Sequence, residues 1–206
     1  MRRMGHRGAM GHAPENTIAS FQKAIDLGCD EVETDVWLAG DRFVISHDRP
    51  SGGGGGLSLD EVLDFCRGRM GVNVELKCEA DEAQASATGD RVARHLAARA
   101  DPEVSISSFW WPALVAARSA APAVRRAFLF NDAPDRPTLL ASAASLELYA
   151  LHPNRAYVTA EFVADAHAAG LKVHPWTVND PAEIARFAGF GVDGIMSDYP
   201  ERIPKG

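Results

Sequence analysis

Several features that would define a protein class are scarce or absent in this chain of 206 residues. It has only three cysteines and no CxxC pair, which removes the usual zinc and redox motifs. The small, odd number also disfavours a disulfide framework, so we expect reduced, mostly buried thiols. No apolar run approaches the roughly 20 residues of a membrane-spanning helix, and no apolar segment follows the basic residues of MRRMGHRG as in a signal peptide. These absences predict a cytoplasmic protein without stable membrane insertion.

Positive charge is also in deficit. The chain holds 21 Lys and Arg against 28 Asp and Glu, a net charge of -7. Nucleic-acid binding depends on clusters of Lys and Arg, so no nucleic-acid partner is expected. A small phosphorylated molecule needs only one or two local cations and remains compatible with this charge. The sequence is silent on the oligomeric state.

Short apolar or alternating runs are separated by stretches with helical periodicity. We expect strands at residues 2–6, 30–38, 42–48, 71–77, 103–109, 123–130, 145–151, 171–178 and 192–198. We expect helices at residues 16–28, 57–68, 79–100, 112–120, 136–144, 159–170 and 181–191.

This alternation predicts parallel strands joined by helical crossovers. Eight such steps favour a (β/α)8 TIM barrel, with residues 1–206 forming a single domain. The alternative is an open doubly wound sheet, which the missing GxGxxG fingerprint disfavours. In a barrel, the chemistry is expected at the C-terminal ends of the strands.

Acidic side chains are expected at that end on two strands. In EVETDV, Glu33 and Asp35 are two residues apart and therefore point to the same face. In VNVELK, Glu75 and Lys77 share a face in the same way. Three converging carboxylates repel one another unless a cation neutralises them, and an all-oxygen site suits Mg²⁺ or Ca²⁺. The alternative is a set of ion pairs with Arg and Lys at the rim.

Two histidines, His6 and His47, each follow a predicted strand. Because histidine titrates near neutrality, such a pair can accept and donate a proton in one cycle. Arg7 and Lys77 bring positive charge to the same rim, where they can bind a phosphate. The alternatives are inert loop histidines, an ion pair of Lys77 with a neighbouring glutamate, and a rim salt bridge of Arg7.

These residues belong to an ordered set of motifs that resembles the glycerophosphodiester phosphodiesterases. The matching pieces are HRG, PENT, EVETDV, HD, VELK, SF, WTVN and DGIMSDYP, which extend from His6 to Pro200. The resemblance implies a (β/α)8 barrel that uses one divalent metal ion to hydrolyse glycerophosphodiesters to glycerol 3-phosphate and an alcohol. The nucleophile would be either the glycerol 2-hydroxyl or a water activated by the metal.

The resemblance also implies a role for individual residues. It makes His6 and His47 the catalytic acid–base pair, in an order that it leaves open. It makes Glu33, Asp35 and Glu75 the metal ligands, and Arg7 and Lys77 the contacts to the phosphate. Trp176 would be an aromatic residue of the glycerol pocket, with an ordinary core residue as the alternative.

One segment departs from the family pattern. After HD the family carries a longer, capping insertion, whereas this chain has RPSGGGGG, in which we expect Gly52–Gly56 to form a mobile loop and leave a more open mouth. The head group of the substrate is therefore left open. Two alternative functions are open: the hydrolysis of lysophospholipids or other phosphodiesters by a related phosphodiesterase, and the binding of glycerophosphodiesters without catalysis.

Overall fold

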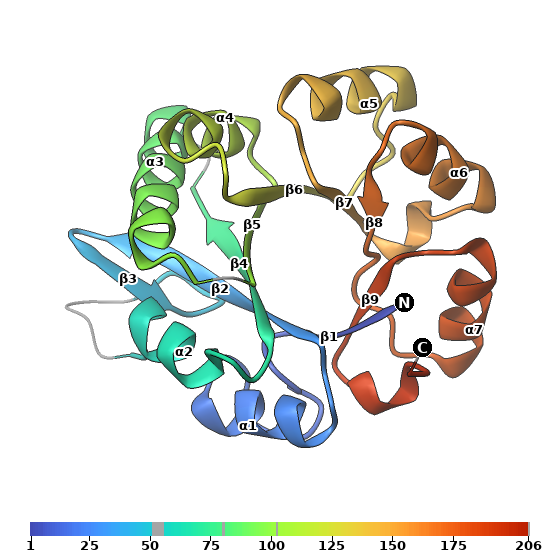
Figure 1. Ribbon diagram of the computed structural model, residues 1–206, viewed down its shortest axis with the longest axis horizontal. Coiled ribbons are helices and arrows are strands. Elements are labelled where there is room, and N and C mark those ends of the chain that lie inside the picture. Colours follow the sequence, from blue (N-terminus) through green and yellow to red (C-terminus); the bar gives the residue numbers. More distant parts are fainter. Residues whose placement is uncertain (51–55, 80, 102, 206) are drawn as a thin grey trace.

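The strands form a ring that is surrounded by helices, as Figure 1 shows in a view down the ring. The structure is a computed structural model that describes residues 1–50, 56–79, 81–101 and 103–205. Its strands are β1 (Arg2–Gly5), β2 (Glu31–Ala39), β3 (Arg42–Ile45), β4 (Gly71–Lys77), β5 (Val104–Ser108), β6 (Arg125–Phe130), β7 (Ala150–Pro153), β8 (Lys172–Val173) and β9 (Gly194–Ser197).

The strand order is that of a nearly closed barrel. The parallel neighbours run β8-β7-β6-β5-β4-β2-β1-β9, while β3 pairs antiparallel with β2 outside this path. Backbone hydrogen bonds join the two ends, since the N–H of Asp193 donates to the carbonyl of Val173 and that of Met196 to Pro175, both at 3.0 Å. The predicted (β/α)8 barrel is therefore confirmed.

The helices connect successive strands around the outside of the ring (Figure 1). Capping boxes at Thr17 and Ser58 fix the starts of two of them, because each side chain and the residue three positions on satisfy each other's backbone N–H groups. The helices are α1 (Ile18–Asp26), α2 (Leu59–Cys66), α3 (Glu82–Arg99), α4 (Trp111–Ala120), α5 (Arg136–Ser145), α6 (Ala160–Ala168) and α7 (Pro181–Phe190), with short 3₁₀ turns at Arg155–Tyr157 and Pro200–Arg202.

Side chains alternate between the two faces of each strand. Val32 and Val36 belong to the apolar core between the sheet and the helices, so the acidic residues of β2 between them face the barrel interior. The interior also holds a pair of fully buried histidines, with Nε2 of His152 lying 3.1 Å from Nδ1 of His174. Burial lowers the pKa of both rings, and for His152 to about 3.

Two strand boundaries differ from the sequence-based expectation. The strand expected at 145–151 begins only at Ala150, because α5 continues to Ser145 and the chain then turns through Glu147, whose φ is 49°. The strand expected at 171–178 is reduced to Lys172–Val173. Pro175 follows it closely and has no N–H to donate to a ladder.

Other expectations from the sequence have mixed outcomes. The three cysteines are free thiols, two buried and one partly exposed. Among the described residues, no helix is long and apolar enough to cross a membrane. Of the segment Gly52–Gly56, only Gly56 lies within the described residues, so the loop in place of the cap stays a prediction.

Candidate active site

A small pocket of about 160 Å³ opens at the C-terminal ends of the strands. It combines charged side chains on one side with apolar side chains on the other. The lining residues are His6, Arg7, Glu33, His47, Glu75, Lys77, Phe109, Leu129, Trp176 and Met196. The structure therefore brings to one place seven of the eight residues singled out from the sequence, and Asp35 lies directly beside them.

Glu33, Asp35 and Glu75 form a buried acidic cluster in which one oxygen of each lies within 4.8 Å of the others. The parallel pairing of β2 and β4 sets Asp35 beside Glu75. Burial, and then the neighbouring carboxylates, raise the pKa values of Glu33 and Glu75 above their ordinary range. Such a cluster is costly to keep ionised without a compensating cation.

The oxygens of this cluster suit a metal ion. Oε1 of Glu33 and Oδ1 of Asp35 are buried without a hydrogen-bond partner among the described residues. Their other oxygens are held: the backbone N–H of Arg7 donates to Oε2 of Glu33 at 2.9 Å, and Nδ2 of Asn16 donates to Oδ2 of Asp35 at 2.8 Å. A carboxylate with one oxygen oriented by a hydrogen bond and the other without one is suited to bind Mg²⁺ or Ca²⁺.

Asn16 is the first residue of the helix expected at 16–28, and its contact with Asp35 was not predicted. Thr17 is the N-cap of α1, which releases the Asn16 side chain for other partners. Oδ1 of Asn16 accepts a hydrogen bond from Oγ1 of Thr34 at 2.8 Å, and the backbone of Asn16 has a φ of 56°. Asparagine tolerates this left-handed conformation better than most residues, which gives the PENT motif a physical reason for Asn at this position.

Arg7 and Lys77 are both paired with the acidic cluster. Nε of Arg7 lies 3.2 Å from Oδ2 of Asp35, and Nη1 of Arg7 lies 2.8 Å from Glu15. Nζ of Lys77 lies 3.1 Å from Oε1 of Glu75 and 3.5 Å from Oδ1 of Asp35. Burial lowers the pKa of Lys77, but the carboxylates of Glu75 and Asp35 outweigh it and raise the value. The ion pair considered for Lys77 is therefore present, within reach of the same pocket.

His6 and His47 line the pocket together, but their surroundings differ. Nδ1 of His6 lies 2.7 Å from Oδ1 of Asp198, whose side chain is 21% exposed. Nδ1 of His47 lies 3.0 Å from Oδ1 of Asp48, whose side chain is 94% exposed. Asp198 belongs to the DGIMSDYP motif, and no role was predicted for it. Because it lies 192 positions away from His6 along the chain, no local sequence pattern indicates this contact.

Trp176 is both a packing residue and a wall of the pocket. Its Nε1–H donates to the carbonyl of His152 at 2.8 Å, and its ring meets the edge of Phe109 at 5.5 Å between centroids. Leu129 and Met196 complete the apolar side. Phe109, Leu129 and Met196 were not predicted as pocket residues, since apolar residues at strand ends resemble ordinary core residues.

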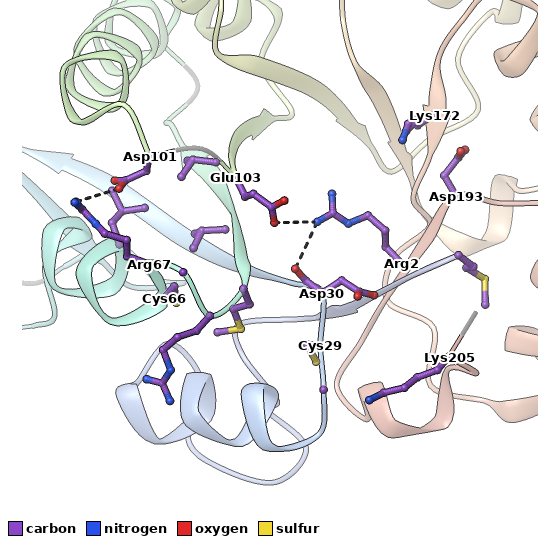
Figure 2. Close-up of a pocket in the computed structure, with 18 of the residues that line it drawn as sticks. Arg2, Cys29, Asp30, Cys66, Arg67, Asp101, Glu103, Lys172, Asp193 and Lys205 are labelled. Atoms are coloured by element: carbon purple, nitrogen blue, oxygen red, sulfur yellow. Dashed lines mark hydrogen bonds and ion pairs between the residues drawn. The ribbon is translucent and has the colours of Figure 1, made fainter.

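A much larger cavity, about 1220 Å³, lies at the opposite face, at the N-terminal ends of the strands (Figure 2). Figure 2 shows Arg2 between Glu103 and Asp30 near its centre. Arg2 pairs with Glu103 at 3.8 Å, and Asp101 pairs with Arg67 at 3.0 Å. None of the residues singled out from the sequence as site residues lines this cavity.

The sequence profile of the glycerophosphoryl diester phosphodiesterase family matches residues 6–67 and 54–202. The chain belongs to this family. It is 28% identical to a glycerophosphodiester phosphodiesterase from Caldanaerobacter subterraneus subsp. tengcongensis, over 97% of this chain and 95% of that one. It is 26% identical to a glycerophosphodiester phosphodiesterase from Bacillus altitudinis, over 97% and 95%.

Solved structures agree with this family assignment. A putative glycerophosphoryl diester phosphodiesterase from Silicibacter pomeroyi is 28% identical with a TM-score of 0.84, over 97% of this chain and 90% of that one. An Oleispira antarctica phosphodiesterase in complex with the product sn-glycerol-3-phosphate is 29% identical with a TM-score of 0.83, over 97% and 94%. The predicted resemblance to this enzyme family, and with it the class of phosphoric diester hydrolase, is confirmed.

Proposed function

We propose that this chain hydrolyses glycerophosphodiesters to glycerol 3-phosphate and an alcohol, using one divalent metal ion and two histidines. The observation that carries the proposal is the convergence of two buried carboxylate oxygens, of Glu33 and Asp35, that lack a hydrogen-bond partner among the described residues, with His6 and His47 around one pocket. The Oleispira antarctica relative, crystallised with sn-glycerol-3-phosphate, supports the same substrate class.

Glu33, Asp35 and Glu75 would hold the ion, either Mg²⁺ or Ca²⁺. When bound, the ion neutralises charge on the phosphate oxygens and orients them. Arg7 and Lys77 add positive charge at the same position, so that the two phosphate oxygens that do not react are stabilised during the displacement. The two histidines exchange protons with the nucleophile, either water or the glycerol 2-hydroxyl, and with the departing alcohol.

The size of the pocket restricts which part of the substrate it encloses. Pockets that enclose drug-sized ligands measure roughly 300–1,000 Å³, whereas this one measures about 160 Å³. A glycerol phosphate unit is of a size to fit, with Trp176 and Phe109 against the glycerol carbons. The alcohol on the other side of the phosphorus then lies outside, which predicts tolerance of different small head groups.

The test is the release of glycerol 3-phosphate from glycerophosphocholine, with and without EDTA. We expect activity that is lost in EDTA and restored by excess Mg²⁺ or Ca²⁺, and a loss of about 10²–10⁴-fold in kcat for His6→Ala and for His47→Ala. Circular dichroism of both variants controls for folding. Full turnover in EDTA by metal-free protein would refute the metal requirement, and a His6→Ala variant with wild-type kcat would refute the acid–base assignment.

A further inference from the structure

Behind His6 lies a set of hydrogen bonds that links three segments of the chain. The Nδ1–H of His6 donates to Oδ1 of Asp198 at 2.7 Å. The other oxygen of Asp198, Oδ2, accepts from Nδ2 of Asn179 at 2.7 Å. The backbone N–H of Asp198 donates to Oδ1 of Asn179 at 2.9 Å. Both oxygens of the carboxylate are therefore fixed in direction.

Asn179 is itself held in place. Its Oδ1 accepts a second hydrogen bond, from Oγ of Ser197 at 2.9 Å, and its carbonyl accepts from Nη1 of Arg202 at 2.8 Å. The backbone N–H of His6 donates to the carbonyl of Ser197 at 3.0 Å. Since β1 and β9 are neighbouring strands of the barrel, the imidazole and its carboxylate are attached to one rigid unit.

This arrangement determines which nitrogen of His6 carries hydrogen. An ionised carboxylate can only accept hydrogen bonds, so the hydrogen must be on Nδ1. Burial raises the pKa of Asp198, but the hydrogen bonds from His6 and Asn179 outweigh it and bring the value below the ordinary one. In the neutral ring, Nε2 then presents its lone pair and can accept a proton.

Among the residues that the structure describes, the His47 ring has no comparable anchor. Its partner Asp48 is the next residue in the chain, and the carboxylate is 94% exposed. Water competes with the imidazole for such an exposed carboxylate, so the contact holds the ring weakly. The two histidines of the pocket are therefore unequal.

We infer that Asp198 and Asn179 are positioning residues that make His6 the general base and leave His47 as the general acid. The inference rests on the proposed function and assigns the order that it leaves open. Nε2 of His6 takes the proton from the nucleophile, either water or the glycerol 2-hydroxyl, and that oxygen forms its bond to phosphorus. The bond from phosphorus to the leaving oxygen breaks with its electron pair on that oxygen, which takes a proton from His47. If the 2-hydroxyl attacks, a water must then open the cyclic phosphate to give glycerol 3-phosphate.

The experiment compares Asp198→Asn, His6→Ala and His47→Ala on two glycerophosphodiesters, one with choline and one with p-nitrophenol as the leaving group. Nitrophenolate departs without protonation, so the His47→Ala defect should shrink on that substrate. The defects of His6→Ala and Asp198→Asn, which act on the nucleophile, should persist on both. For Asp198→Asn we expect a loss of about 10²–10⁴-fold in kcat with little change in KM.

Asp193→Asn is the matched control, because Asp193 also contacts a histidine, His167, at 2.9 Å but at the opposite face. It should leave kcat within about twofold. Asn179→Ala, which keeps the carboxylate but removes its support, should lose about tenfold and serves as the second variant if Asp198→Asn folds poorly.

Long-range ¹H–¹⁵N NMR of the free protein reads the tautomer without any turnover. We expect hydrogen on Nδ1 of His6 in the wild type and a mixture of tautomers in Asp198→Asn. An Asp198→Asn variant with wild-type kcat, a His6→Ala or Asp198→Asn defect that shrinks on the nitrophenyl substrate, or a wild-type His6 with hydrogen on Nε2 would each overturn the inference. A wild type that cleaves neither diester would instead refute the proposed function, and the NMR result would still decide the tautomer.

Discussion

The two ends of the barrel both collect charged residues, but they differ in how those charges are satisfied. At the C-terminal ends, three buried carboxylates approach within 4.8 Å of one another and two of their oxygens lack a hydrogen-bond partner. At the N-terminal ends, Asp30, Asp101, Glu103 and Asp193 line a far larger cavity, and none of their oxygens is buried without a hydrogen-bond partner among the described residues. Buried carboxylate oxygens without a hydrogen bond, rather than cavity size, mark the candidate site.

Exchanging one acid at each end tests this contrast most severely. Glu75→Gln removes a proposed ligand, and we expect kcat/KM for glycerophosphocholine to fall by about 10²–10⁴-fold, since a correctly placed ion contributes several kcal/mol to phosphoryl transfer. Glu103→Gln at the opposite end should change kcat/KM by less than about twofold. Equal losses for both variants would mean that the two ends do not differ in function.

Metal binding should stabilise the protein through the C-terminal end alone. An ion at about 100 times its Kd adds about 2.7 kcal/mol to the free energy of unfolding, or roughly 5–10 °C in Tm for a chain of this size. Glu33→Gln should abolish the shift, while Glu103→Gln should retain it. Differential scanning calorimetry with and without Mg²⁺ or Ca²⁺ measures both, and a shift that persists in Glu33→Gln would contradict the site.

The buried pair of His152 and His174, inside the barrel, should make the free energy of unfolding depend on pH. The pKa of His152 is lowered to about 3, so below the ordinary value of about 6.5 the unfolded chain binds a proton that the folded chain excludes. His152 alone should therefore lower the free energy of unfolding by about 1.4 kcal/mol per pH unit from about pH 6.5 down towards pH 3. Urea unfolding between pH 7 and pH 5 measures this slope, which His152→Gln should reduce because glutamine takes no charge.

The smallest effect is expected for the exposed ion pair at the N-terminal end. Glu103 is 62% exposed and lies 3.8 Å from Arg2. Glu103→Ala should lower the free energy of unfolding by less than about 0.5 kcal/mol, because water screens such pairs. A loss above 2 kcal/mol in urea unfolding would show that this face depends on its charges more than the contrast above allows.

The barrel could be predicted from the sequence because its helices and strands have local signals. These are the periodicity of apolar residues and helix caps such as Thr17 and Ser58. The sequence predicted the acidic cluster because the spacing of Glu33 and Asp35 places both on one face of one strand. It misplaced the strand near Ala150 because an apolar run such as LELYAL fits a helix end and turn as well as a strand.

What the sequence could not supply are contacts between distant segments. Asp198 meets His6 where β9 pairs with β1, and Asn16, which precedes the N-cap Thr17, reaches Asp35 on β2. No local pattern distinguishes such a carboxylate or amide from one on the surface. The apolar side of the pocket, at Leu129 and Met196, is equally invisible, since those residues also satisfy the rule for a buried core.

The central claim is tested most directly by anomalous diffraction from crystals soaked in Mn²⁺, a stand-in for the hard divalent ion. The account predicts one strong peak bonded to oxygens of Glu33, Asp35 and Glu75, and no comparable peak at the N-terminal cavity. A peak among Asp30, Glu103 and Asp193 with none at the acidic cluster would contradict it.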